Sequence, residues 1–303
     1  MAENKFLIII AGPTAVGKTA VAIAIASHFD TEIISADSRQ VYKELSIGVA
    51  RPSEEELKAV KHHFIASKSV HDYYSAGEYE RECMALLDTL FRIKNIVVMC
   101  GGTGLYIKAV CDGFDEIPEV GSEIREQLNA ELEKSGIEPL QKRLEQLDPE
   151  TFATMDIQNS QRVIRALEVC IGSGMPFSAF RKGKKEKRNF TPVKICLNTN
   201  KEELYRRIDH RVDGMMQKGL LEEAKAIYPY KNNNALQTVG YKELFDHFDG
   251  IISLDEAVEK IKQHTRNYAK RQLTWFRKDK AFTWFEPGET SNIIQFINSQ
   301  MLS

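Results

Sequence analysis

The sequence KFLIIIAGPTAVGKTAVAIAIA, from Lys5 to Ala26, opens with a nearly continuous apolar run. Such a run is typical of a strand buried inside a parallel sheet. The eight residues after it match the pattern G-x-x-x-x-G-K-[ST], and residues 20–26 then have the composition of a helix. A strand, a glycine-containing loop and a helix in this order predict a phosphate-binding loop.

The loop pattern specifies how phosphate would be held. Glycines let backbone N–H groups curl around phosphate oxygens, and the following helix adds the positive end of its dipole. Lys18 supplies a positive charge, and the Thr19 hydroxyl is a suitable ligand for Mg²⁺. Backbone amides do not read the rest of the ligand, so ATP or another nucleotide also remains a candidate. We predict phosphate contacts from Gly12, Pro13, Thr14, Ala15, Val16, Gly17, Lys18 and Thr19.

Further strands and helices alternate along the first third of the chain. Residues 32–35 and 96–100 are short apolar segments that we expect to be strands. Residues 53–60, 75–92 and about 103–110 have helical patterns, and Ser75 with Glu78 fits a capping box. This alternation predicts an α/β fold with a parallel sheet and phosphate chemistry at the carboxyl ends of the strands.

The pattern changes near Asp112. Residues 121–180 show amphipathic helices and no convincing strand, and an apolar segment at 193–198 resumes the sheet. We therefore expect a helical insertion domain at 115–190, within a P-loop core of residues 1–114 and 191–303. Helical patterns at 201–218, 220–228, 240–248 and 254–278 give that core a helical C-terminal half.

Composition and charge exclude several classes of protein. Hydrophobic residues make up 43% and charged residues 28% of the 303 residues, which argues against a disordered chain or a coiled coil. The longest apolar run is too short for a membrane span. The net charge is only −2, but residues 181–188 and 260–280 are strongly basic. These clusters fit either contact with a polyanion or a solvated surface.

The cysteines do not suggest a metal or disulfide framework. There are five, and none forms a C-x-x-C pair. Histidines 62, 63 and 71 have no ligand-like spacing and are interpreted as structural or surface residues. Reduced, buried thiols indicate a cytoplasmic protein.

Two features set the loop apart from that of an ordinary ATPase, and a pair of arginines is a further candidate for the site. The strand at 96–100 ends in Cys100 and is followed by two glycines and Thr103, where an ATPase usually carries a metal-organising Asp. The strand at 32–35 is instead followed by Asp37, which fits a base for an incoming nucleophile or a cap on the next turn. Arg207 and Arg211 lie four residues apart on a predicted helix and therefore share one face. That face is either a clamp for a diphosphate or a surface exposed to solvent.

Taken together, these motifs resemble those of one family. They are GPTAVGKT, SADSRQVY from Ser35, GGTGLY from Gly101, QRVIRALE from Gln161, VGY from Val239 and AKRQLTWFR from Ala269. In order and spacing the chain resembles the bacterial form of the tRNA dimethylallyltransferases, also called tRNA isopentenyltransferases. The resemblance runs from about residue 7 to 285.

The resemblance implies a reaction. The dimethylallyl group of dimethylallyl diphosphate would pass to the exocyclic N6 of the adenosine just 3′ of the anticodon. The tRNAs concerned read codons beginning with U, and diphosphate would be released without ATP hydrolysis. The enzyme would extrude the target base from the anticodon loop. It also implies Mg²⁺ as cofactor, bound through the diphosphate and Thr19, and the tRNA anticodon stem-loop as partner of a monomer without a membrane segment.

The resemblance also assigns roles to residues. The phosphate loop would bind the donor diphosphate, Asp37 would accept the N6 proton or orient the amine, and Thr103 would contact the target nucleotide. Arg211, and with it Arg207, would stabilise the leaving diphosphate. Implied tRNA contacts are Asp37, Ser38, Arg39, Gln40, Thr103, Arg125, Gln161, Arg162, Val163, Ile164, Arg165, Gln237, Gly240, Tyr241 and Lys242.

Other contacts and two rival functions remain open. The basic segment 181–188 would lie near RNA phosphates, and Trp275 on the last basic helix fits RNA contact or core packing. One rival function is a small kinase that uses the same loop and an Asp after the second strand. The other is an RNA-binding protein without catalytic activity, which leaves Asp37 unexplained.

Overall fold

The computed structural model describes residues 4–115, 117–118, 120–181, 183 and 186–302. The chain divides into two compact units. The core unit comprises Met1–Asp112 and Lys187–Ser303, and the inserted unit comprises Gly113–Glu186.

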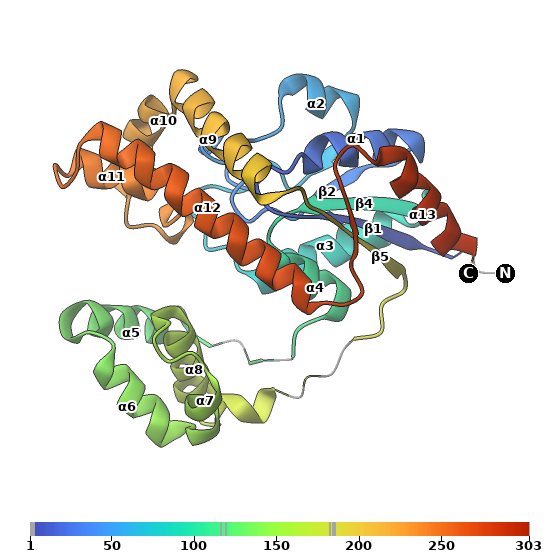
Figure 1. Ribbon diagram of the computed structural model, residues 1–303. Helices are drawn as coiled ribbons and strands as arrows, with labels where there is room; N and C mark the ends of the chain where they lie inside the picture. The colour runs from blue at the N-terminus through green and yellow to red at the C-terminus, as the bar shows by residue number, and fades with distance from the viewer. Residues whose placement is uncertain (1–3, 116, 119, 182, 184–185, 303) are drawn as a thin grey trace. The chain divides into compact units, whose positions relative to one another are not determined.

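The core unit is built on one six-stranded sheet whose paired strands all run parallel (Figure 1). The strand order is β3-β2-β4-β1-β5-β6, so the phosphate-loop strand lies between β4 and β5 near the middle. The strands are β1 (Phe6–Ala11), β2 (Ile33–Ser35), β3 (His62–His63), β4 (Ile96–Gly101), β5 (Thr191–Leu197) and β6 (Thr283–Phe285).

Both faces of the sheet are covered by helices, which explains the unbroken apolar sequence of β1. Side chains alternate along a strand. Leu7 and Ile9 therefore join the apolar cluster under one set of helices, and Ile8 and Ile10 the cluster under the other. The first face is covered by α3 (Ala76–Leu90) and α4 (Gly104–Asp112), and the second by α1 (Lys18–His28) and α13 (Thr290–Leu302) (Figure 1).

The remaining helices of the core unit build a third apolar cluster beside the sheet. It packs the segment after Asp37 against the helical C-terminal half, with Tyr241 and Leu220 completely buried. Ser253 caps the longest helix through a capping box. The helices are α2 (Glu54–Ala59), α9 (Lys201–Gln217), α10 (Leu220–Ile227), α11 (Tyr241–Phe248) and α12 (Leu254–Lys278), with short 3₁₀ turns at Tyr228–Tyr230 and Asn234–Leu236.

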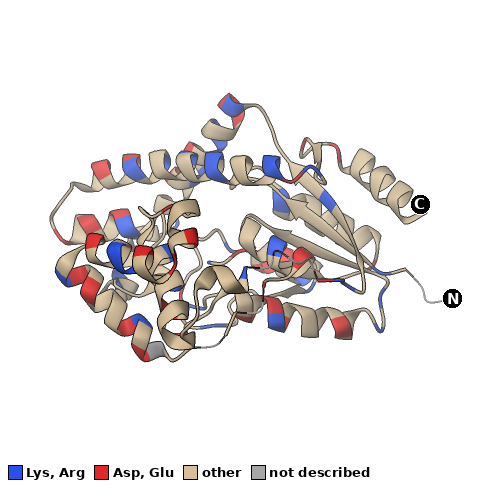
Figure 2. Ribbon diagram, turned by 90° about the horizontal axis from the view of Figure 1, so that it is seen from below, with Lys and Arg blue, Asp and Glu red and all other residues tan. Residues whose placement is uncertain are grey.

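Helix α12 carries one of the two basic clusters. Its first turn is acidic, with Asp255 and Glu256, and lysines and arginines recur from Lys260 to Lys278 (Figure 2). Acidic residues at the start and basic residues at the end of a helix both stabilise the helix, because their charges interact favourably with its dipole.

The inserted unit has an apolar core of its own, centred on Leu140, Leu144, Val163, Ile164 and Leu167, which are all completely buried. Its elements are α5 (Ser122–Ser135), α6 (Glu138–Leu147), α7 (Pro149–Thr154), α8 (Ser160–Ser173) and a 3₁₀ turn at Phe177–Phe180 (Figure 1). A separate core of this kind is expected of a unit that folds around its own helices.

The predicted fold class, a parallel α/β P-loop core, is confirmed. The sequence reading missed β3, β6, α7 and α13. The two strands contain two and three residues at the edges of the sheet, which is too short for a period-two pattern to register. Of the described helices, none combines the length and the apolar composition required to cross a membrane.

Candidate active site

The phosphate loop connects β1 to α1 and is shaped by close backbone approaches. A Cβ on Gly12 would lie 2.7 Å from the carbonyl oxygen of Leu197 on β5, so only glycine fits there without a shift. Gly17 and Ala15 both have positive φ, of 104° and 64°. Glycine adopts this conformation at no steric cost, whereas Ala15 does so under strain. The loop therefore holds the curled shape that its sequence pattern predicted.

Lys18 is held against its own loop. Its Nζ donates a hydrogen bond to the carbonyl oxygen of Pro13 at 2.7 Å. Burial lowers the pKa of Lys18, and the nearby Asp37 partly opposes that shift. A buried ammonium group with so few partners is ready to exchange its backbone contact for an incoming anion.

Cys100 at the end of β4 brings no negative charge to the cavity. Burial raises the pKa of its thiol to about 12, so the group stays protonated at neutral pH. Its neighbour Gly101 packs on the chain after β2, where a Cβ would lie 2.1 Å from the carbonyl oxygen of Ala36. This close approach brings the turn of Asp37 next to the turn of Thr103.

The two turns are joined by hydrogen bonds. The Thr103 hydroxyl oxygen accepts from the backbone N–H of Ser38 at 3.0 Å and donates to the Ser38 hydroxyl at 3.3 Å. Asp37 Oδ1 accepts from the N–H groups of Arg39 at 2.9 Å and Gln40 at 3.3 Å. Within the described chain no hydrogen bond reaches Asp37 Oδ2. Asp37 therefore caps its turn with one oxygen and keeps the other for a ligand.

Tyr268 on α12 lies near Asp37 and Thr103. It lines the same cavity, and burial raises the pKa of its hydroxyl to about 12, with the charge of Asp37 adding to the shift. The phenol is therefore neutral at physiological pH. The sequence reading did not single out this residue.

Gln272 on α12 is a second site residue that the sequence reading missed. Its side-chain oxygen accepts from the N–H of Thr14 in the phosphate loop, and its nitrogen donates to the carbonyl oxygen of Gly102, both at 2.9 Å. The side chain is buried. One glutamine thus ties the phosphate loop to the turn after β4. Its place in AKRQLTWFR gave no chemical signal, because its partners are 258 and 170 residues away.

The structure distinguishes the two arginines of α9. Arg207 pairs with Glu203 at 2.6 Å and donates to the carbonyl oxygen of Val16 at 3.2 Å. Arg211 lines the cavity, and burial lowers its pKa while Asp37 opposes the shift. An arginine stays protonated in such surroundings. Arg211 is therefore the arginine that faces the cavity, and Arg207 contacts the backbone of the phosphate loop outside it.

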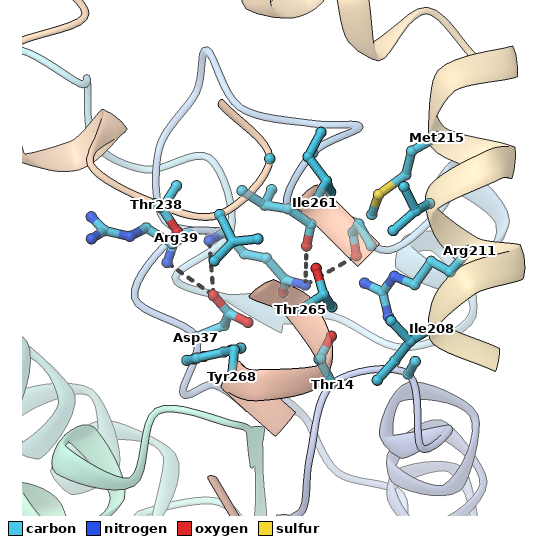
Figure 3. Close-up of a pocket in the computed structure, with 18 of the residues that line it drawn as sticks. Thr14, Asp37, Arg39, Ile208, Arg211, Met215, Thr238, Ile261, Thr265 and Tyr268 are labelled. Atoms are coloured by element: carbon cyan, nitrogen blue, oxygen red, sulfur yellow. Dashed lines mark hydrogen bonds between the residues drawn. The ribbon is translucent and has the colours of Figure 1, made fainter. Parts of the chain in front are cut away.

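Asp37, Tyr268 and Arg211 line one cavity of about 870 Å³, whereas Thr103 and Arg207 lie outside its lining. Figure 3 shows Asp37 and Tyr268 on one side and Arg211 with Met215 on the other. Thr14, Lys18 and Thr19 form part of the lining. Asp37 is the cavity's candidate base, and the loop with Arg211 is its candidate anion site.

The segment from Gln237 to Lys242 also borders the cavity, with one exception. Gln237, Gly240 and Lys242 line it. Tyr241 is completely buried, and its hydroxyl donates to Glu223 at 2.6 Å. The prediction that the Tyr241 side chain contacts RNA is therefore wrong. Its ring packs inside the core unit and supports this segment.

The residues after Asp37 have divided roles. Arg39 lines the cavity and donates to the carbonyl oxygen of Asn234 at 3.3 Å. The Gln40 amide donates to the carbonyl oxygens of Val49 and Ala50, at 3.2 and 3.1 Å. Gln40 therefore holds the following loop in place, although it also lies at the cavity wall.

In the inserted unit, two of the candidate tRNA contacts pair with one buried carboxylate, and a third is hydrogen-bonded to one of these two. Glu168 is 6% exposed and pairs with Arg125 at 3.1 Å and Arg165 at 2.8 Å. Arg125 also donates to Gln161 at 3.2 Å. The network sets the direction of both guanidinium groups.

The stretch from Gln161 to Arg165 is only partly exposed. Arg162 is exposed on α8. Val163 and Ile164 are 0% exposed and belong to the apolar core of the unit. The prediction that these two side chains contact RNA is therefore wrong, because on the helix they point to the opposite side from the polar residues.

The basic segment 181–188 contains a second correction. Lys182, Lys184 and Lys185 lie outside the described residues. The Arg188 side chain is 9% exposed, is paired with Glu80 and donates to the carbonyl oxygen of Ala109 at 2.8 Å. Arg188 is therefore a structural residue of the core unit, and our expectation that it contacts RNA phosphates is wrong.

Trp275 packs and remains accessible. A Cβ on Gly104 would lie 2.1 Å from its indole nitrogen, so the ring rests on the start of α4, yet the residue is 40% exposed.

Fold and site together define a P-loop α/β protein whose phosphate cavity faces a carboxylate. Residues 40–279 match the sequence profile described as IPP transferase. The chain belongs to this family, and the predicted resemblance is confirmed. The curated "tRNA dimethylallyltransferase" of Christiangramia forsetii is 52% identical over 98% of this chain and 99% of its own length. That of Flavobacterium johnsoniae is 49% identical, over 99% of each chain.

Solved structures agree with the sequence relatives. The full-length tRNA isopentenylpyrophosphate transferase of Bacillus halodurans superposes with a TM-score of 0.73 at 34% identity, over 98% of this chain and 97% of that one. A eukaryotic dimethylallyltransferase, described as acting on tRNA, superposes with a TM-score of 0.74 at 28% identity, over 90% and 70%. The predicted enzyme class, a transferase, is confirmed.

Proposed function

We propose that this protein transfers the dimethylallyl group of dimethylallyl diphosphate to the exocyclic N6 of the adenosine 3′-adjacent to the anticodon. The tRNAs are those that read codons beginning with U. The observation that carries the proposal is the single cavity in which a phosphate loop and Arg211 face Asp37. The names of the relatives supply the substrate classes.

The donor diphosphate lies in the phosphate loop. Backbone N–H groups and the start of α1 receive its oxygens, and Lys18 exchanges its hydrogen bond with Pro13 for one of them. Arg211 approaches from α9. As the allylic C–O bond breaks, negative charge accumulates on the diphosphate. These fixed positive groups therefore stabilise the transition state more than the ground state.

Asp37 acts on the acceptor. Its Oδ1 is occupied by two backbone N–H groups, which orients Oδ2 toward the cavity. The N6 amine attacks the first carbon of the donor, a C–N bond forms, the C–O bond breaks, and the N6 proton passes to Oδ2. Thr103 holds this geometry through Ser38. We propose that Thr103 also contacts the target nucleotide.

The donor set fits Mg²⁺ of the kind that accompanies phosphates. Thr19 offers one hydroxyl oxygen at the cavity, and among the described residues no cluster of three acidic, histidine or cysteine side chains forms a metal site. Mg²⁺ commonly takes one or two protein oxygens and completes its shell with phosphate and water. We propose Thr19 as its protein ligand. When bound, the ion would neutralise diphosphate charge.

Apart from Gly240, a buried residue whose backbone borders the cavity, the proposed RNA contacts are polar side chains that are at least partly exposed. We propose tRNA contacts from Ser38, Arg39, Gln40, Gln237, Gly240 and Lys242 in the core unit and from Arg125, Gln161, Arg162 and Arg165 in the inserted unit. The anticodon stem-loop is the partner of the inserted unit in this proposal. A monomer acting in the cytoplasm completes it.

The decisive experiment is incorporation of label. Purified protein with Mg²⁺ is incubated with unmodified tRNA and radiolabelled dimethylallyl diphosphate, without ATP. We expect label on an anticodon-loop adenosine and about 10²- to 10⁴-fold slower single-turnover transfer by Asp37→Asn, the usual contribution of a general base. Asp255→Asn, an exposed change on α12, is the matched control. Folded wild-type protein that labels no tRNA in a total pool, or consumes ATP instead, would contradict the proposal.

A further inference from the structure

One wall of the cavity is apolar and follows a single face of α9. Ile208, Val212 and Met215 are spaced i, i+4 and i+7, and Arg211 stands on the same face between them. Ile261 of α12 lines the cavity too (Figure 3). Apolar side chains have no role in binding diphosphate, so this wall suits the hydrocarbon part of the donor.

The order of these residues along α9 gives the wall a direction. Arg207 touches the phosphate loop, and Arg211 lies one turn further on. Met215 follows after four more residues, about 6 Å along the helix axis at 1.5 Å per residue. A hydrocarbon chain that begins at a diphosphate held by Arg211 therefore meets Met215 after about one helical turn.

The loop at Gly48, which also lines the cavity, is tightly packed against the helical C-terminal half. A Cβ on Gly48 would lie 2.6 Å from the Tyr241 ring and 2.9 Å from Leu220, so the loop backbone lies directly on them. Both side chains are completely buried. The Glu223 carboxylate fixes the loop by accepting from three successive N–H groups, of residues 46 to 48, at 2.8 to 3.0 Å.

Met215 differs from its neighbours in the wall. Val212 is 2% exposed and Ile208 is 0% exposed, because both are buried members of apolar clusters of the core unit, whereas Met215 only packs against one of these clusters. Met215 is only half-buried. Methionine is also the most flexible side chain of the three. Shortening Met215 therefore lengthens the cavity without removing a residue from the centre of a core.

We propose that Met215, opposite Ile261, sets the length of prenyl chain that the enzyme accepts, and that it stops the donor at five carbons. This inference rests on the proposed function. It predicts that a smaller residue at 215 admits a ten-carbon allylic diphosphate. The longer donor would react by the same bond changes, with a C–N bond formed, a C–O bond broken and diphosphate released.

The test compares dimethylallyl diphosphate with geranyl diphosphate as donors to unmodified tRNA, with the product nucleoside identified by mass. For Met215→Ala we expect geranyl transfer, with the ratio of kcat/KM for geranyl over dimethylallyl raised by at least about tenfold relative to wild type. Met216→Ala is the matched control, because that half-buried neighbour does not line the cavity. Its ratio should equal that of the wild type.

The outcomes separate this inference from the proposed function. Transfer from dimethylallyl diphosphate by wild type and Met215→Ala, with no gain for the geranyl donor, overturns the role of Met215 alone. Absence of transfer by wild type from either donor overturns the proposed function. If Met215→Ala does not fold, Met215→Val removes less volume and must show the same change in ratio. An unchanged ratio there counts equally against the inference.

Discussion

Replacing Gln272 with leucine would test how the two halves of the site are held together. The side chain accepts from the N–H of Thr14 and donates to the carbonyl oxygen of Gly102, each at 2.9 Å. Leucine keeps a similar size and removes both hydrogen bonds. The phosphate loop and the turn after β4 then lose their direct connection through α12.

The expected magnitude follows from burial. A buried polar group left without a partner costs about 1–3 kcal/mol. The Gly102 carbonyl bears the full cost because its bond is buried, whereas the Thr14 N–H borders the cavity and can bind water. The extra apolar surface of leucine offsets part of the loss. We expect a net decrease of about 2 kcal/mol in the free energy of unfolding, or about 3 °C in Tm for a chain of this size.

Two assays are needed for this variant, thermal unfolding and steady-state transfer kinetics. Because Thr14 belongs to the phosphate loop, the KM for the prenyl donor should rise more than the KM for tRNA. Gln263→Leu makes the same chemical change at an exposed position of α12 and should stay within about 0.5 kcal/mol of wild type. If Gln272→Leu matches that control in both Tm and donor KM, the bridging role is refuted.

Three further changes test other parts of the structure. Arg211→Ala should slow single-turnover transfer by about 10²-fold or more, and Arg207→Ala by only a few-fold, because only Arg211 lines the cavity; equal losses would contradict this. Gly101→Ala should destabilise the protein by about 1–3 kcal/mol or more, because the new Cβ would lie 2.1 Å from a backbone oxygen after β2. Gly77→Ala, with no contact below 3.8 Å, is its control in thermal unfolding. Burial acts to raise the pKa of Asp148 in the inserted unit, but hydrogen bonds from neighbouring N–H and O–H groups outweigh it and lower that pKa. Its contribution to stability is therefore present above the unfolded pKa near 3.9 and lost as pH falls through the lower folded value. Asp148→Asn should make the free energy of unfolding fall less steeply as the pH is lowered below about 4. An unchanged pH dependence of the free energy of unfolding would contradict this role of Asp148.

Local pattern was sufficient wherever neighbouring residues build the feature. The apolar run of β1, the loop pattern and the following helix lie within 24 consecutive residues, from Lys5 to His28, and the structure has all three. The capping box at Ser75 is confirmed for the same reason, because its hydrogen bonds span three residues. Period-two strands at the sheet edges are absent from the prediction because two or three residues carry no period.

Helical periodicity divides the stretch from Gln161 to Arg165 into a buried and an exposed side. On α8, Val163 and Ile164 face the core of the inserted unit, while Arg162 is exposed. A family motif marks the whole stretch, whereas the period of 3.6 residues separates its buried side from its exposed side. The two arginines of α9 are a harder case, because both lie on one face and only the position of the phosphate loop distinguishes them.

The sequence by itself determined the α/β class, the phosphate loop and the family, because each is written in contiguous residues or in the order of motifs. Only the tertiary structure decided that Gln272 joins Thr14 to Gly102. It also decided that Arg211 rather than Arg207 faces the cavity, and that Met215 lines the same cavity one helical turn after Arg211. Those relations depend on which strands and helices become neighbours. Packing sets that neighbourhood, since burying the apolar faces of the sheet brings α9 and α12 to the ends of β1 and β4.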